Sequence, residues 1–97
     1  MYEKSITCTA QNGIHTRVSH GLSQWAITFE SDIFMTSRGI TVDAKSILNI
    51  LTLGIVSGTS VVVSANGADE KEAVDKIIEM FSNNDFDPPL YIDDCSE

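Results

Sequence analysis

His15 and Arg17 are the side chains of this sequence whose types and spacing best suit chemistry. They lie in the polar, glycine-containing segment 12–17, and the amphipathic pattern after it predicts that a helix begins there. The first amides of a helix lack intrahelical partners and carry partial positive charge, so they can bind an anion. A neutral imidazole is nucleophilic, and a guanidinium binds phosphate oxygens. His15 is therefore a candidate phosphoryl carrier, although an ordinary polar residue at a helix start is the alternative.

Two motifs in this order resemble the HPr family of histidine phosphocarriers of the bacterial phosphotransferase system. Residues 13–18 read Gly-Ile-His-Thr-Arg-Val, and residues 44–54 read Ala-Lys-Ser-Ile-Leu-Asn-Ile-Leu-Thr-Leu-Gly. The similarity covers residues 2 to about 82. Val18 stands where the family usually has proline, and we interpret it as an apolar residue that packs inward. The run 80–87 faintly resembles the nitrogen-related branch of the family.

The resemblance implies a stoichiometric carrier rather than an enzyme, with no cofactor. His15 would accept a phosphoryl group from phosphorylated enzyme I and pass it to a histidine of a sugar-specific or regulatory IIA domain. The backbone amides of Thr16 and Arg17 would bind the phosphoryl oxygens, because positioning and charge stabilisation are the main requirements of such a transfer. The family's surface for these partners matches Thr16, Arg17, His20, Ile47, Leu48 and Leu51.

Ser46 has two interpretations. Serine is a good N-cap, and Ser46 directly precedes the helical pattern of residues 47–53. In low-GC Gram-positive members of the family the matching serine is phosphorylated by a dedicated kinase, which makes a serine kinase a further partner. An alternative function is a regulatory binding module on the same fold, which acts through its exposed apolar patch, is switched at Ser46 and no longer uses His15.

Composition limits the other possibilities. At 97 residues, of which 42% are hydrophobic, the chain suits a single folded domain. A net charge of −8 without a basic face disfavours nucleic acid as a partner. Metal-ligand spacing, a membrane span of about 18 apolar residues and a basic-then-apolar signal pattern are all missing from the sequence. We therefore predict a cytoplasmic protein, expected to be a monomer, without a metal site.

Periodicity predicts strands in 2–9, 33–37, 40–42 and 61–65, and helices in 16–27, in 47–53 and from Asp69 to Phe81. The fold class is therefore α+β, an open-faced sandwich of order βαββαβα, with three helices on one face of a four-stranded, mostly antiparallel sheet. The resemblance implies the same fold. Asp69 and Glu72 have the spacing of a capping box, and Gly21 suggests that a strand or helix passes close to the first helix.

The predicted domain covers residues 1–82, and residues 83–97 form a predicted flexible acidic tail. The tail holds five acidic residues and no basic one, and it contains two prolines in succession. Such a segment lacks periodic apolar positions that could pack on the domain. We therefore expect that removing residues 86–97 leaves thermal stability nearly unchanged.

Overall fold

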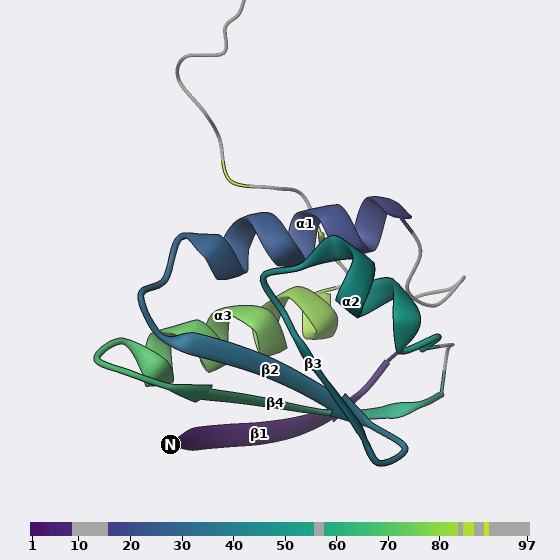
Figure 1. The fold of residues 1–97 in the computed structure, drawn as a ribbon, viewed down its shortest axis with the longest axis horizontal. Coiled ribbons are helices and arrows are strands. Elements are labelled where there is room, and N and C mark those ends of the chain that lie inside the picture. The colour runs from purple at the N-terminus through teal and green to yellow at the C-terminus, as the bar shows by residue number, and fades with distance from the viewer. Residues whose placement is uncertain (9–15, 56–57, 84, 87–88, 90–97) are drawn as a thin grey trace, which may run out of the picture.

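The computed structural model describes residues 1–8, 16–55, 58–83, 85–86 and 89, with the backbone alone for Thr16 and Arg17. Within these residues the elements follow the predicted βαββαβα order (Figure 1). They are β1 (Tyr2–Thr7), α1 (Thr16–Ile27), β2 (Asp32–Ser37), β3 (Ile40–Asp43), α2 (Ile47–Thr52), β4 (Ser60–Asn66) and α3 (Glu70–Asn83). No helix in the described part of the chain has the length and apolar content needed to cross a membrane.

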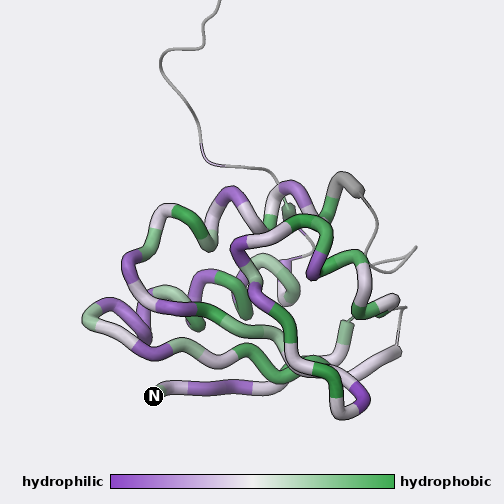
Figure 2. The backbone as a smooth tube through the Cα atoms, in the orientation of Figure 1, coloured by the Kyte–Doolittle hydropathy of each residue, from purple (hydrophilic) through white to green (hydrophobic). Residues whose placement is uncertain are grey.

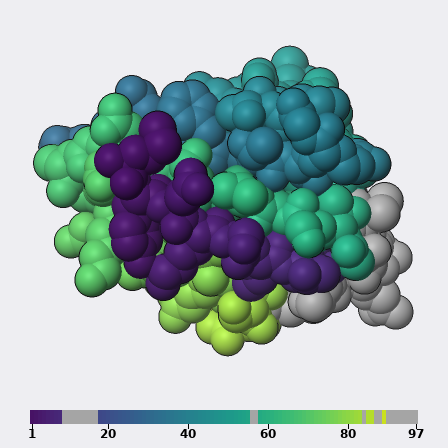
Figure 3. All heavy atoms as spheres, turned by 90° about the horizontal axis from the view of Figure 1, so that it is seen from below, coloured from purple at the N-terminus to yellow at the C-terminus, as the bar shows by residue number. Residues whose placement is uncertain are grey.

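The described strands form one sheet in the order β1-β4-β2-β3, and every neighbouring pair is antiparallel. Met35 on β2 pairs with Val42 on β3 and with Val63 on β4, which fixes the register of the three strands. The helices lie on one face of the sheet (Figure 1), and Figure 3 views the molecule from the side of the strands. The predicted layering is confirmed, and the sheet is antiparallel throughout the described strands.

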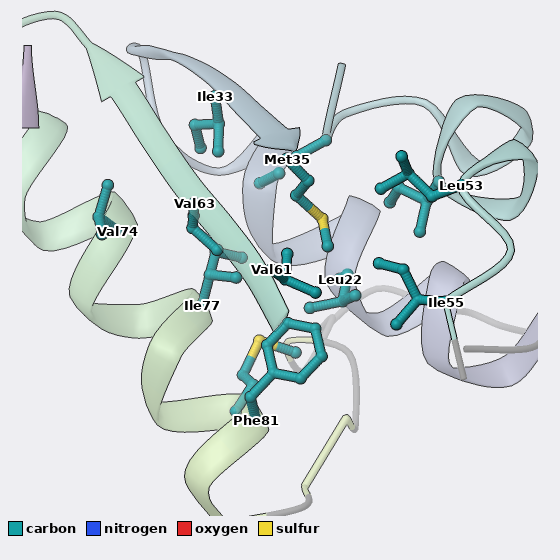
Figure 4. Close-up of a cluster of buried hydrophobic side chains, with 14 of the residues drawn as sticks. Leu22, Ile33, Met35, Leu53, Ile55, Val61, Val63, Val74, Ile77 and Phe81 are labelled. Atoms are coloured by element: carbon teal, nitrogen blue, oxygen red, sulfur yellow. The ribbon is translucent and has the colours of Figure 1, made fainter. Parts of the chain in front are cut away.

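The core lies between the sheet and the helices. Alternate residues of a strand point to one face, and Val61, Val63 and Ala65 of β4 are accordingly fully buried. They meet side chains from the helices, including Leu22 of α1 and Ile77 of α3 (Figure 4). Burial of these aliphatic side chains, each about 1.5–3 kcal/mol, is what holds the helical layer on the sheet.

Helix α1 has an inward and an outward face, as expected of an amphipathic helix. Val18, Leu22 and Ala26 are buried, whereas His20 and Ile27 are exposed. The buried position of Val18 agrees with its interpretation as an apolar residue that packs inward. Helix α1 is therefore fixed along one side and open to solvent along the other.

Helix α3 also holds α1 in place. The Lys76 ammonium of α3 lies 4.1 Å from the ring centre of Trp25 on α1. A cation over an aromatic face is attracted by the ring's negative face, by about 0.5–1 kcal/mol at exposed sites. The two helices contact one another, so this pair reports directly on their relative position.

The structure corrects the predicted position of Phe86, which the sequence assigned to a flexible tail. The Asp85 amide donates to the Met80 carbonyl at 3.0 Å, and Phe86 is only 9% exposed. The Phe86 ring packs edge-on against Phe81, with 5.3 Å between the ring centroids. The folded body therefore includes Phe86. Residues 90–97 lie outside the described residues, and for them the tail remains a prediction.

Phe86 also explains Gly21. A Cβ atom built on Gly21 would collide with the Phe86 carbonyl group, whose carbon would lie 2.7 Å away. The prediction that something passes close to Gly21 is confirmed, but the neighbour is the backbone that follows α3 rather than a strand or a helix.

The predicted capping box at the start of α3 is wrong. The Asp69 carboxylate accepts hydrogen bonds from the Glu30 amide (2.9 Å), the Ser31 amide (2.9 Å) and the Ser31 hydroxyl (2.5 Å). These donors, led by the Ser31 hydroxyl, hold the pKa of Asp69 below its usual value. Asp69 therefore joins the start of α3 to the turn between α1 and β2, and leaves Glu72 unused as a capping partner.

Candidate functional site

The start of α1 is the centre of the candidate site. Thr16 is the first residue of α1, so His15 directly precedes the helix in the chain. The amides of Thr16 and Arg17 lie in the first helical turn, where a backbone N–H has no intrahelical acceptor. His15 itself and the side chains of Thr16 and Arg17 lie outside what the structure describes, and their roles remain predictions. His20 is exposed one turn further along, as expected for a contact residue.

Helix α2 begins at Ser46, as predicted. Ser46 is extended (φ −115°, ψ 118°), and its hydroxyl accepts the Asn49 amide at 3.3 Å. The Asn49 side-chain amide also donates to this hydroxyl, at 3.0 Å. The N-cap interpretation of Ser46 is therefore confirmed, while its phosphorylation remains a prediction.

The carboxyl end of α2 is held by Arg38, a contact that the sequence did not predict. The Arg38 guanidinium donates to the carbonyl oxygens of Leu53 (2.6 Å) and Gly54 (3.2 Å). The end of a helix leaves carbonyls without partners and carries partial negative charge, which a cation complements. Arg38 reaches this position from the β2–β3 turn with a positive φ of 53°. The sequence shows that residue 38 is a cation in a turn, but no local pattern indicates that this turn lies against the end of α2.

Helix α2 presents an apolar patch that we define as Ile47, Leu48 and Leu51. Leu48 is 74% exposed, and Ile47 and Leu51 are half-buried. Ile50, by contrast, is fully buried, and so is Leu53 just after the helix. This short helix has more apolar residues than one inward stripe can use, and Figure 2 shows α2 largely in the hydrophobic colour.

The two helices that carry the predicted partner-binding residues lie against one another. Helix α1 contacts α2, and the first turn of α1 and the last turn of α2 lie toward the same end of the molecule (Figure 1). The Lys45 ammonium donates to the Phe29 carbonyl at 3.0 Å, which joins the loop before α2 to the loop after α1. His20 and the apolar patch therefore lie on two helices that contact one another.

Comparison with known proteins gives the family. The model of the PTS HPr component phosphorylation site matches residues 2–83. The phosphocarrier protein HPr of Vibrio cholerae is 45% identical over 78 residues, which are 80% of this chain and 92% of that protein.

Solved structures agree with this result. The crystal structure of HPr-C-His from Thermoanaerobacter tengcongensis has a TM-score of 0.83 and 34% identity, covering 86% of this chain and 93% of that one. A structure described as an HPr dimer from the same organism has a TM-score of 0.69 and 33% identity, covering 87% and 97%.

These relatives do not support the suggested nitrogen-related branch, which rested on the weak similarity of residues 80–87. The curated relatives instead carry the name phosphocarrier protein HPr, and the family model covers the start of α1, all of α2 and the whole described sheet. The chain therefore belongs to the HPr family, and it is a phosphocarrier of the phosphotransferase system rather than a catalytic enzyme.

Proposed function

We propose that His15 is the phosphoacceptor, which receives a phosphoryl group from phosphorylated enzyme I and passes it to a histidine of a IIA domain. A nitrogen of the neutral imidazole attacks the phosphorus, and the new N–P bond forms as the donor's N–P bond breaks. The second transfer repeats this exchange with the IIA histidine as the nucleophile. The amides of Thr16 and Arg17, together with the Arg17 guanidinium, stabilise the charge on the phosphoryl oxygens.

One observation carries this proposal: His15 stands immediately before the first turn of α1, inside the residues matched by a family model for a phosphorylation site. An anion at that place meets amides that have no acceptor within the helix. His20 is the other histidine of the chain, and it follows one turn later on the exposed side of α1. Five residues along a helix correspond to a rotation of about 140°, so His20 is a contact residue rather than a second acceptor.

The apolar patch on α2 supports docking of both partners beside the acceptor. Leu48 is three-quarters exposed although α2 buries its Ile50, so it stabilises the fold little. A small apolar surface with a polar rim suits a brief encounter between proteins. Enzyme I and IIA domains would use the same surface in turn, which requires weak and rapidly exchanging binding.

Incubation with enzyme I and labelled phosphoenolpyruvate tests the acceptor. Wild-type protein should gain a label that is stable in alkali and lost in acid, whereas His15→Ala should gain none. His20→Ala is the matched control and should be labelled as fully as the wild type. An unlabelled wild-type protein would contradict the proposal and favour the regulatory module that acts through the apolar patch.

Arg17 is tested separately from the acceptor. Arg17→Glu reverses the charge at the phosphoryl oxygens, so it should impair transfer far more than it impairs folding. If Arg17→Glu transferred phosphoryl groups at the wild-type rate, Arg17 would not be part of the site.

We expect a monomer in the cytoplasm, the compartment typical of the family, and measurement of the molar mass in solution distinguishes it from a dimer.

Ser46 is the candidate regulatory position. A phosphate there would lie at the amino end of α2, where the Ser46 hydroxyl already accepts two hydrogen bonds from Asn49. Added negative charge next to the apolar patch would repel acidic surfaces of a partner. Ser46→Asp should therefore slow transfer from enzyme I, while Ser46→Ala should not.

A further inference from the structure

The contact between Phe86 and α1 lies beyond the residues that the family model matches. The family model ends at residue 83, whereas the aromatic pair and the collision at Gly21 both involve Phe86. The backbone at Phe86 lies directly on α1, while its ring packs on Phe81 of α3. This segment therefore joins the end of α3 to the middle of the helix that begins at the candidate acceptor.

We propose that Phe86 is a positioning residue for phosphoryl transfer, which fixes α1 through Gly21 and so holds the amides at the start of that helix in place. The inference rests on the proposed function of His15 for its catalytic consequence. Its structural part, that Phe86 restrains α1, stands independently of which residue accepts the phosphoryl group.

The physical argument begins with the distance along the helix. Gly21 follows Thr16 by five residues, which is about 7.5 Å of helix at a rise of about 1.5 Å per residue. A helix is stiff over so short a length, so a shift of the axis at Gly21 moves the first turn with it. Transfer depends on the placement of donors around the phosphoryl group, and a misplacement of about 1 Å can cost about 100-fold in rate.

Phe86 is anchored to the folded body through its side chain. Phe86 is 9% exposed, and its edge-on geometry with Phe81 adds attraction beyond the burial of apolar area. Phe81 is itself 1% exposed and belongs to the same core cluster as Leu22 of α1. Removal of the Phe86 ring would open a space beside Phe81 and release the backbone that lies on Gly21, whereas leucine would fill much of that space.

The experiment compares Phe86→Ala, Phe86→Leu and Gly21→Ala in the full-length chain with Val74→Ala as a control. Val74 is a fully buried residue of α3 two turns before Phe81, so its truncation destabilises the fold without removing the Phe86 contact. All variants are studied at a temperature at which each remains folded. The readouts are amide hydrogen exchange in α1 and the kcat and KM of phosphoryl transfer from enzyme I.

We expect Phe86→Ala and Gly21→Ala to speed exchange of the α1 amides selectively and to lower kcat about 10-fold with little change in KM. Phe86→Leu should stay close to the wild type. Val74→Ala should lower the Tm without either effect. If the α1 amides exchange no faster in Phe86→Ala than in Val74→Ala, the proposal that Phe86 restrains α1 is overturned.

If Phe86→Ala accepts the phosphoryl label with the kcat of the wild type, the positioning role is overturned, while the restraint of α1 by Phe86 is still decided by hydrogen exchange. Failure of the proposed function is distinguishable, because the wild type would then carry no label while the exchange comparison still decides whether Phe86 restrains α1.

Discussion

Helices α2 and α3 lie in the same layer but use their apolar residues differently. The apolar residues of α3 face the core, and the buried ones are Ala73, Val74, Ile77, Met80 and Phe81. Helix α2 has less than half the length of α3, yet it leaves Leu48 three-quarters exposed. A helix with all its apolar residues in the core serves stability, whereas a helix with a surplus provides a surface. The comparison indicates where mutations should affect folding and where they should affect binding.

The two helices also begin differently. The Ser46 hydroxyl caps its own helix, while the Asp69 carboxylate binds the turn between α1 and β2. Helix α2 is therefore stabilised locally at its start, and α3 is stabilised by a contact that bridges distant parts of the chain.

The largest effect should come from the core side of α3. Ile77→Ala removes a fully buried side chain and leaves a cavity, so it should lower the free energy of unfolding by about 2–5 kcal/mol in urea titrations. Transfer per folded molecule should stay at the wild-type level, since Ile77 lies in no predicted partner surface. A loss below about 1 kcal/mol would show that α3 does not depend on its buried stripe.

Arg38 should have the next largest effect, because it supports the surface helix from outside. Arg38→Ala removes the donor to the Leu53 and Gly54 carbonyls and should cost about 1–2 kcal/mol in the same titration. Arg38→Gly is the matched control, since glycine adopts the positive φ of this turn without strain. If Arg38→Gly had the same free energy of unfolding as the wild type, backbone strain rather than the guanidinium contact would determine the stability at this position.

Ser46 and Asp69, which directly precede α2 and α3, should differ in their pH dependence. The pKa of Asp69 is lowered in the folded state, so its stabilising effect is present above the ordinary carboxyl value and is lost as the pH falls through the folded-state value. Asp69→Asn should therefore lower the Tm at neutral pH, and the difference from wild type should shrink on acidification. Ser46→Ala should cost about 1 kcal/mol at every pH. Parallel Tm profiles for wild type and Asp69→Asn would contradict this assignment.

The smallest effect on stability should come from Leu48→Ala. This side chain is already mostly in water, so the free energy of unfolding should change by no more than about 0.5 kcal/mol. Its affinity for enzyme I, measured by titration, should nevertheless fall. Thr52→Ala is a control on the same helix with an exposed polar residue, and it should leave the affinity unchanged. Equal affinity for wild type and Leu48→Ala would remove the apolar patch from the docking surface.

The elements could be predicted because their signals are local. A run of valines ended by Asn-Gly predicted β4, and the i, i+3, i+7 spacing of Val74, Ile77 and Phe81 predicted α3. The surplus of apolar residues on α2 could be counted directly, which indicated that some are exposed but not that Leu48 is the most exposed of them. The candidate acceptor was predicted from residue types and from the family resemblance.

The errors concern contacts between distant residues. Asp69 has the spacing of a local cap, but its partners lie 38 and 39 positions earlier, and no local pattern indicates them. Phe86 follows a polar break after α3, so periodicity gave no reason to place it in the core. Gly21 was the one sign of this contact in the sequence. A glycine within a helix indicates a close neighbour, but it does not identify that neighbour.

The Trp25–Lys76 pair has a practical consequence. The chain contains one tryptophan, so its tryptophan fluorescence arises from a single indole whose spectrum depends on the nearby ammonium group. Movement of α1 away from α3 would change the emission wavelength and the access of a soluble quencher to that ring. The protein thus contains its own optical probe, and partner binding can be followed without attaching a dye.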